Sequence, residues 1–178
     1  RRLIEVLEKK QFPIDQLFLI ASSKSVGKKI NFKGIEHSIL DLEKFDFSSV
    51  KIAFFAAGSS VAEKWAHVAA EKTIVIDNSK FFRKDADIPL IVPEVNPKQL
   101  TQVKNRNIIA NANCSVIPVV VALKPLHDLY NIKRIVASTY QSVSGAGKAP
   151  MDELLSQTKD FFENKNLSSS YFTKQIAF

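Results

Sequence analysis

The sequence has little cysteine and no long hydrophobic stretch. Cys114 is the single cysteine among 178 residues, so an internal disulfide framework is excluded and a reducing compartment such as the cytosol is expected. Apolar runs such as VVVAL at 119–123 are far too short to cross a bilayer, and no signal-peptide pattern opens the chain. Repeats and low-complexity segments are also absent. We therefore predict a cytoplasmic globular protein with no membrane partner.

The charge is unbalanced toward the basic side, with a formal net charge of +7. The lysines and arginines are scattered, and acidic residues interrupt them in LEKK, DLEKFD and FRKDAD. A nucleic-acid-binding surface needs a denser basic stripe. We predict a solvated basic surface that attracts small phosphorylated anions, with no nucleic-acid partner and no metal site.

Segments of strand length that are apolar on both faces alternate with helical patterns, which is typical of parallel βαβ units in an α/β fold with helices covering a sheet. Helices are expected at 3–10 and at 60–72, the second opened by a Ser60–Glu63 capping box. A small hairpin is expected to turn at Lys33–Gly34. Buried strands are expected at 16–23, 50–58, 73–79 and 107–112.

The pattern changes near Cys114, and we predict a domain boundary there, between residues 1–113 and 114–178. Residues 132–143 alternate between apolar and polar side chains, which predicts a strand of antiparallel type. The segment SGAG and a helix at 149–165 follow it.

The first domain carries features of a dinucleotide site but not its glycine-rich fingerprint. The chain starts at a helix, so we expect the first strand and the glycine-rich loop to be missing from it. After the strand at 16–23 come Ser22, Lys24 and Ser25 with no acidic residue, which favours the 2′-phosphate of NADP over the ribose of NAD. An ordinary polar loop explains these residues equally well. Ser59, in AAGSS, marks either close approach of a cofactor or tight packing.

Cys114 stands immediately before a predicted helix. Pro118 is best tolerated in the first turn of a helix, so the helix is expected to start near Cys114–Ser115. The free N–H groups there lower the pKa of a thiol and stabilise an oxyanion, and Asn113 adds a polar neighbour. The alternative is a buried cysteine that acts as a small apolar residue.

The segments NANCSV, VVVALKPLHDLY and STYQSVSGAG resemble aspartate-β-semialdehyde dehydrogenase. ASSKSVGKKI, AAGSSVAEKWA and VIDNSKFFRKDADIPLIVPEVNP extend the resemblance over nearly the whole chain. The family usually has proline in place of Ala112 and threonine in place of Val116.

The resemblance implies a phosphorylating aldehyde dehydrogenase of lysine, methionine and threonine biosynthesis. It implies a reversible, NADP-dependent reductive dephosphorylation of 4-phospho-aspartate to aspartate semialdehyde, with release of inorganic phosphate. The implied architecture is a Rossmann-like NADP-binding domain with a parallel sheet, followed by the start of an α+β catalytic and dimerisation domain. A homodimer or a tetramer is implied as well.

The resemblance also implies the roles of individual residues. Cys114 corresponds to the acyl-thioester nucleophile, and Gln141 to a glutamine that contacts the substrate. Ser144 and Gly145 match the part of SGAG that contacts NADP. Arg83 matches a phosphate-binding arginine.

The same comparison assigns further contacts and further alternatives. Asn113 is a second candidate for the phosphate, and Lys24 and Ser25 match the contacts to the 2′-phosphate. N-acetyl-glutamyl-phosphate reductases share the cysteine hexamer, although STYQSVSGAG speaks against them, and a non-catalytic relative is a third possibility.

The family's general-base histidine and carboxylate-binding arginine fall in a later segment. The histidines of this chain, His37, His67 and His127, do not match them and are expected to be surface or packing residues. We therefore expect little turnover from the chain alone, because the thiolate lacks its proton-transfer partner.

Overall fold

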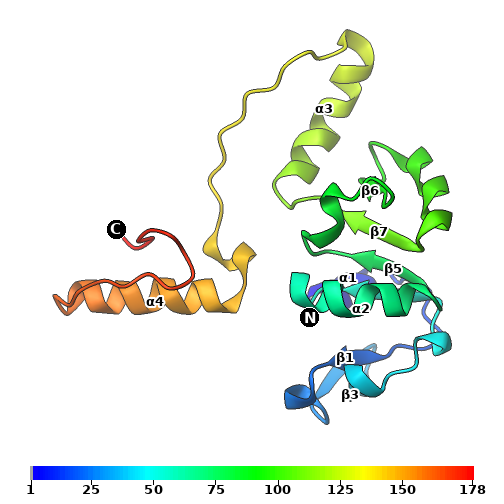
Figure 1. The fold of residues 1–178 in the computed structure, drawn as a ribbon, viewed down its shortest axis with the longest axis horizontal. Helices are drawn as coiled ribbons and strands as arrows, with labels where there is room; N and C mark the ends of the chain where they lie inside the picture. Colours follow the sequence, from blue (N-terminus) through cyan, green and yellow to red (C-terminus); the bar gives the residue numbers. More distant parts are fainter. Residues whose placement is uncertain (1) are drawn as a thin grey trace. The chain divides into compact units, whose positions relative to one another are not determined.

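The computed structural model describes residues 2–178 and divides into two compact units, one ending at Val121 and one comprising Ala122–Phe178. Figure 1 shows the elements of both units. Elements marked η are short 3₁₀ helices.

The first unit alternates short strands with helices. Its elements are, in order, α1 (Arg2–Lys9), β1 (Leu19–Ala21), η1 (Ser23–Ser25), β2 (Lys29–Phe32), β3 (Ile35–Asp41), η2 (Leu42–Lys44), η3 (Phe47–Ser49), β4 (Ile52–Phe55), α2 (Ser59–Ala70), β5 (Ile74–Asp77), η4 (Phe81–Lys84), β6 (Leu90–Ile91), η5 (Pro97–Asn105) and β7 (Ile108–Asn111). Helix α3 (Val116–Tyr130) begins in this unit, and the second unit contains η6 (Val143–Ala146) and α4 (Lys148–Phe162).

Two sheets form the first unit. One has the strand order β4-β5-β7-β6, and all its paired strands run parallel. The other has the order β1-β3-β2, with β1 parallel and β2 antiparallel to β3. The parallel sheet with helical connections confirms the predicted Rossmann-like α/β fold.

The predicted hairpin is confirmed. Strands β2 and β3 pair in antiparallel register from Lys29↔Ser38 to Phe32↔Ile35. The two turn residues, Lys33 and Gly34, have φ angles of 51° and 80°, as the twist of a two-residue hairpin requires.

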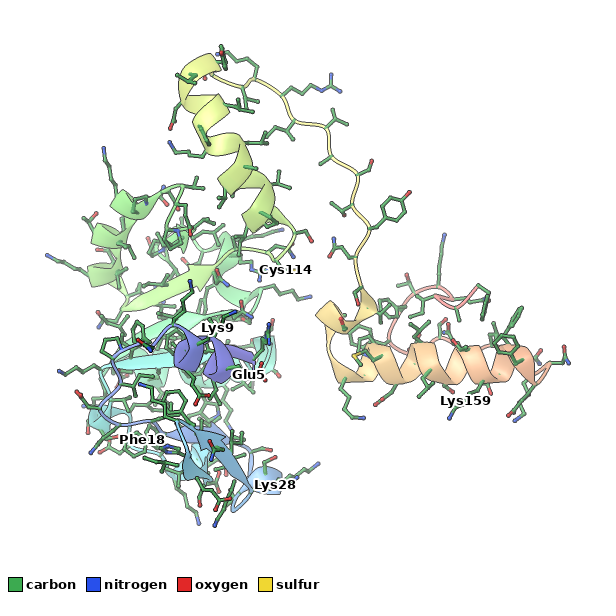
Figure 2. All side chains as sticks on the ribbon, turned by 180° about the vertical axis from the view of Figure 1, so that it is seen from behind. Glu5, Lys9, Phe18, Lys28, Cys114 and Lys159 are labelled. Atoms are coloured by element: carbon green, nitrogen blue, oxygen red, sulfur yellow. The ribbon has the colours of Figure 1, made fainter. Side chains whose placement is uncertain are left out.

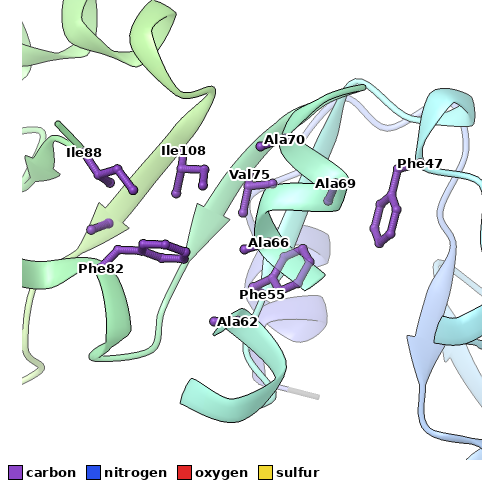
Figure 3. Close-up of a cluster of buried hydrophobic side chains, with 11 residues drawn as sticks. Phe47, Phe55, Ala62, Ala66, Ala69, Ala70, Val75, Phe82, Ile88 and Ile108 are labelled. Atoms are coloured by element: carbon purple, nitrogen blue, oxygen red, sulfur yellow. The ribbon is translucent and has the colours of Figure 1, made fainter. Parts of the chain in front are cut away.

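The core of the first unit lies where α2 packs against β4, β5 and β7 (Figure 3). Helix α2 presents small side chains, Ala62, Ala66, Ala69 and Ala70, which allow it to approach the sheet closely. The strands contribute larger apolar side chains such as Val75 and Ile108, which are fully buried.

The expectation that the strands are buried on both faces is wrong for β4. Phe55 faces the core, whereas Ile52 and Phe54 are more than two-fifths exposed. Helix α2 covers the face of β4 that carries Phe55, so the alternating side chains of the other face remain in contact with solvent.

The predicted capping box is also wrong. Helix α2 starts at Ser59, and its N-cap is Gly58, with a φ angle of 96° and no side-chain hydrogen bond. Ser60 therefore lies inside the first turn and cannot cap the helix.

The predicted strand at 132–143 is absent. Residues 131–142 have no regular secondary structure, and their alternating apolar side chains are exposed: 56% for Ile135, 80% for Val136 and 104% for Tyr140. A strand needs a neighbour for its backbone hydrogen bonds, and no residue of the described part of the chain pairs with this segment.

The second unit is organised by two buried polar residues of α4. The Glu153 carboxylate accepts hydrogen bonds from the N–H (3.1 Å) and the hydroxyl (2.8 Å) of Ser170 and from the N–H of Tyr171. Gln157 Oε1 accepts from the N–H of Ala177 (3.1 Å). These bonds hold the segment 168–177 against α4, whose predicted position after SGAG is confirmed.

Across residues 2–178, none of the helices combines the length and the hydrophobicity that a bilayer crossing demands.

Candidate active site at the carboxyl ends of the parallel strands

The predicted site residues of the first unit follow the carboxyl ends of parallel strands. The loop Ser22–Ser25 follows β1, Ser59 follows β4, and Arg83 lies in η4 after β5. Asn113 and Cys114 follow β7. Strands β4, β5 and β7 belong to one sheet, whereas β1 belongs to the other. In open α/β sheets the carboxyl edge is where ligands bind, because loops and helix N-termini gather there.

Cys114 lies in the turn that starts α3, and Figure 2 labels its position. Its side chain is exposed, and its Sγ atom lies 3.9 Å from Ser115 Oγ. Pro118 occupies the first turn of α3, so the predicted placement of the helix start is confirmed. The alternative of a buried, apolar cysteine is wrong.

Asn113 caps α3. Its side-chain Oδ1 accepts a hydrogen bond from the Ser115 N–H (2.9 Å), and its carbonyl oxygen accepts from the Ile117 N–H (3.0 Å). An asparagine in this position fixes the direction of the helix and the conformation of the turn. Asn113 therefore helps to fix the place of the neighbouring cysteine.

Arg83 is anchored at the same edge of the sheet. Its Nε atom donates to the carbonyl of Asn111 at the end of β7 (2.9 Å), and Nη2 donates to the carbonyl of Asn78 just after β5 (3.3 Å). The preceding residue, Phe82, is 1% exposed and anchors η4 in the core. Arg83 itself is half-buried, and within residues 2–178 no carboxylate forms an ion pair with it.

A buried carboxylate shapes the turn that leads to Arg83. Asp77, the last residue of β5, is fully buried and accepts hydrogen bonds from the N–H (3.0 Å) and the hydroxyl (2.6 Å) of Ser79. Ser79 Oγ in turn accepts from the Phe81 N–H (3.1 Å). These short-range bonds set the direction in which the chain enters η4.

Two residues at this edge were missed by sequence reasoning. Asn111 Nδ2 donates to Asn78 Oδ1 at 2.7 Å. Asn78 directly follows strand β5, and Asn111 is the last residue of strand β7. A polar residue at the end of an apolar strand was therefore the signal that could have identified both. The contact depends on the pairing of β5 with β7, which the sequence pattern does not specify.

The loop after β1 presents exposed polar groups. Ser22 and Lys24 are exposed, and Ser25 is half-buried. The Ser25 N–H donates to the Ser22 carbonyl (2.9 Å), which closes the turn of η1. No acidic side chain occurs between Ser22 and Lys29, so the loop is positively charged.

Ser59 begins α2, whose N-terminus has no side-chain cap. The first N–H groups of α2 lie shortly after the carboxyl end of β4. Free N–H groups at a helix start favour an anionic partner.

The remaining predicted residues lie in the second unit. Gln141 is exposed, and its Nε2 donates to Thr139 Oγ1 (3.2 Å). Ser144 belongs to η6, where its hydroxyl lies 2.7 Å from that of Ser142. Gly145 is exposed in the same turn.

The histidines have the environments expected of surface or packing residues. The His37 ring packs against Phe32 at 6.2 Å, and His67 packs edge-on against Phe82 at 5.2 Å, measured between ring centroids. His127 is exposed on α3.

Family models match both parts of the chain. The model described as semialdehyde dehydrogenase, NAD binding domain, matches residues 1–103. The model described as semialdehyde dehydrogenase, dimerisation domain, matches residues 123–178.

Individual proteins agree with the family models. Aspartate-semialdehyde dehydrogenase 2 of Vibrio cholerae is 51% identical over 177 residues, which cover 99% of this chain and 52% of that protein. The crystal structure of aspartate semialdehyde dehydrogenase II from Vibrio cholerae, complexed with ASA, matches with a TM-score of 0.90 at 50% identity, covering 99% of this chain and 53% of that one. The crystal structure of the Candida albicans enzyme with NADP matches with a TM-score of 0.60 at 27% identity, covering 74% and 44%.

The chain spans about half the length of the curated relatives it matches. The similarity extends over almost all of this chain, and the match to the NAD-binding domain alone accounts for more than half of it. The resemblance expected from NANCSV and STYQSVSGAG is confirmed, and the chain belongs to the semialdehyde dehydrogenase family, where its relatives are aspartate-semialdehyde dehydrogenases.

Proposed function

We propose that the full-length protein carrying this chain is an NADP-dependent aspartate-semialdehyde dehydrogenase. It converts 4-phospho-aspartate to aspartate semialdehyde reversibly and releases inorganic phosphate. The observation that supports this most directly is that an exposed thiol and an anchored guanidinium both follow the carboxyl ends of paired strands. Cys114 follows β7 at the start of α3, and Arg83 follows β5 and is bonded to the Asn111 carbonyl at the end of β7.

Cys114 is the nucleophile of the proposed reaction. Its Sγ attacks the acyl carbon of the acyl phosphate, the C–S bond forms, and the C–O bond to phosphate breaks with its electron pair leaving on the phosphate oxygen. The N–H groups at the start of α3 are suited to donate to the oxyanion that forms during the attack. In the opposite direction a phosphate oxygen attacks the thioester carbon and the sulfur leaves.

Arg83 holds the phosphate as it leaves or enters. A guanidinium presents several N–H donors in one plane and keeps its charge at every relevant pH. Two backbone carbonyls use part of this donor set and fix the plane of the group. The remaining donors are available to phosphate oxygens, and Asn113 is a second candidate ligand for them.

The loop after β1 suits the 2′-phosphate of NADP. Lys24 supplies positive charge, the hydroxyls of Ser22 and Ser25 supply donors, and no carboxylate lies in the loop to repel the phosphate. The uncapped start of α2 at Ser59 suits the negative charge of a dinucleotide. The nicotinamide supplies or accepts the hydride in this chemistry.

We assign the other residues from the family resemblance. Gln141 orients the substrate, and Ser144 and Gly145 contact NADP. The functional boundary between the two domains lies at residues 113 and 114, and the protein acts in the cytoplasm as a homodimer or a tetramer.

Replacing the nucleophile tests the proposal. In the full-length protein, Cys114→Ser should lower kcat for NADPH formation from aspartate semialdehyde and phosphate by roughly a thousandfold or more, because a hydroxyl is a far weaker nucleophile. Circular dichroism checks that the variant is folded. Turnover within about tenfold of the unmodified enzyme would contradict a covalent role.

A competition experiment tests the substrate. At fixed NADPH, the full-length protein should consume 4-phospho-aspartate in preference to N-acetyl-glutamyl phosphate when both are present. Preference for the second acyl phosphate would assign the chain to the related reductases. Failure to consume either one would favour a non-catalytic relative.

A further inference from the structure

The amide pair Asn78–Asn111 is polar, specific and not used by the reaction described above. The two asparagines are far apart in the sequence, but the register of β5 and β7 pairs Asp77 with Ala110. The next residues along the two parallel strands are Asn78 and Asn111, so they lie side by side. Asn111 Nδ2 donates to Asn78 Oδ1 at 2.7 Å.

The same two residues hold Arg83 through their backbones. Arg83 Nε donates to the Asn111 carbonyl (2.9 Å), and Nη2 donates to the Asn78 carbonyl (3.3 Å). The side-chain bond between the asparagines ties together the two strand ends that provide these carbonyls. The Asn78 N–H also donates to the Phe55 carbonyl (2.9 Å), which anchors the site to β4.

We infer that Asn78 and Asn111 are positioning residues that hold Arg83 in the orientation in which it binds the phosphate. The inference rests on the proposed function, because it takes Arg83 as the phosphate ligand. The geometry joins three strands, β4, β5 and β7, in one network that ends three residues before the nucleophile Cys114.

The chemistry of the pair suits this role. An amide donates and accepts without carrying a charge, so the pair restrains Arg83 and leaves its positive charge uncompensated. An aspartate at either position would bring a carboxylate close to the guanidinium and compete with the phosphate. Asparagine and aspartate have nearly the same shape, so Asn→Asp changes the charge and leaves the packing intact. An effect of this substitution therefore indicates a role beyond simple packing.

The experiment measures KM for inorganic phosphate, KM for NADP and kcat of the full-length enzyme in the direction that consumes aspartate semialdehyde. Arg83→Lys first tests whether Arg83 binds phosphate. Asn78→Ala, Asn111→Ala and the double variant then test the pair, and Asn78→Asp tests the charge.

A matched control lies at the other end of β7. Asn107 directly precedes that strand, and its side chain donates to the Ala70 carbonyl at 3.0 Å. Its φ angle is 53°, so Asn107→Gly removes the side-chain bond and keeps the backbone conformation.

We expect Arg83→Lys to raise KM for phosphate by roughly tenfold or more, because a lysine lacks the planar set of donors. Each alanine variant should raise it by roughly three- to tenfold, as expected for loss of one hydrogen bond that supports a charged group. The double variant should raise KM for phosphate by the same factor as each single variant, and not by the product of the two factors, since the two residues act as one unit. Asn78→Asp should raise KM for phosphate more than Asn78→Ala. KM for NADP should stay constant in all of them, and Asn107→Gly should leave KM for phosphate unchanged.

Each other outcome has a distinct meaning. Unchanged KM for phosphate in Arg83→Lys overturns the phosphate role of Arg83 in the proposed function, and the inference fails with it. A raised KM in Arg83→Lys with unchanged values in the asparagine variants overturns the inference alone. If Asn107→Gly raises KM for phosphate as much as Asn111→Ala, or if the alanine and aspartate variants all raise both KM values together, the pair acts on general stability and the inference is wrong.

Discussion

Lys24 is the residue on which, in the proposed function, the choice between NADP and NAD depends. Its ammonium group stands in a loop without acidic residues, just beyond β1. In the proposed complex it faces a phosphate that NAD lacks. We therefore expect substitutions at Lys24 to change cofactor specificity rather than the stability of the fold.

Reversing the charge of Lys24 tests this role. Lys24→Glu should raise KM for NADP by roughly ten- to a hundredfold, the range expected when a charge-assisted contact is replaced by repulsion, and should affect NAD much less. Steady-state kinetics with both cofactors measures this. Lys28→Glu is the control, because it makes the same change of net charge at an exposed lysine of the same loop. Equal increases of KM for NADP in the two variants would show that NADP responds only to the net charge of the protein and not to a specific contact with Lys24.

Glu153 is the residue from which we expect the second unit to become sensitive to acid. Hydrogen bonds to its carboxylate, above all from the Tyr171 N–H, lower its pKa from the ordinary value of 4.5. A carboxyl with a lowered pKa in the folded state stabilises the fold above the pKa of the unfolded chain. This stabilisation is lost as the pH falls below about 4.5 toward the folded-state pKa.

Glu153→Gln should therefore weaken the attachment of 168–177 at neutral pH and remove most of its acid dependence. The attachment of this segment to α4 is measured by the hydrogen-exchange protection of peptides from 168–177. The measurement is made at neutral pH and at pH values below 4.5. Asp152→Asn is the matched control, since Asp152 is an exposed neighbour that pairs with Lys148 at 2.6 Å. Equal protection in Glu153→Gln and the unmodified protein at neutral pH would contradict the role of the carboxylate.

At the scale of elements, η4 connects the core to the site. Phe82 lies in the core, and its ring packs edge-on against the rings of Phe81 and His67. The ring centroids are 4.8 Å and 5.2 Å apart, respectively. The next residue is Arg83, so the burial of one side chain determines where the adjacent one is held. Packing and the proposed anion binding therefore belong to consecutive residues.

Phe82→Ala should lower the free energy of unfolding by about 3–5 kcal/mol, the usual cost of truncating a buried phenylalanine. Urea unfolding measures the loss. Phe81→Ala is the control, because Phe81 is 40% exposed and should cost about 1 kcal/mol or less. A similar loss in both variants would show that η4 is not anchored through Phe82.

Sequence reasoning succeeded where the local chemistry restricts the chain. A proline such as Pro118 is best tolerated in the first turn of a helix, so the start of α3 beside Cys114 was predictable, although the same helix also holds Pro125 in its interior. The Lys33–Gly34 turn followed from the same kind of local restriction. The N-cap of α2 was not predictable in this way, because Gly58 occupies the N-cap position with a φ angle of 96° and the helix starts at Ser59, one residue earlier than the Ser60–Glu63 pattern predicts.

The other failures concern contacts between distant segments. The alternating pattern at 132–143 predicts a strand, but a pattern does not provide the partner that a strand requires. The Asn78–Asn111 pair depends on the register of β5 and β7, which no local signal encodes. Candidate residues of the site could be proposed from the sequence, whereas the hydrogen bonds that hold Arg83 are visible only in the structure.

At the scale of the whole molecule, the proposed assembly involves the second unit. The dimerisation-domain model covers residues 123–178. Several large apolar side chains of this region are exposed, including Leu129, Tyr130 and Val136 at 75–80%. Apolar surface of this kind is commonly covered by another chain or another part of the protein.

The full-length protein should therefore sediment as a dimer or a tetramer in analytical ultracentrifugation. Removal of NADP and substrate should leave the assembly intact, because the proposed interface depends on apolar burial. A monomer at the concentrations used for the kinetic assays would contradict the proposed assembly.

The central claim is that Cys114 forms a covalent acyl intermediate. The most direct measurement is mass spectrometry of the full-length protein after incubation with aspartate semialdehyde and NADP in the absence of phosphate, followed by an acid quench. We expect the peptide that contains Cys114 to gain the mass of one aspartyl group, and addition of phosphate before the quench to remove it. An unmodified Cys114 in an enzyme that turns over, or an aspartyl group on any other residue, would contradict the account.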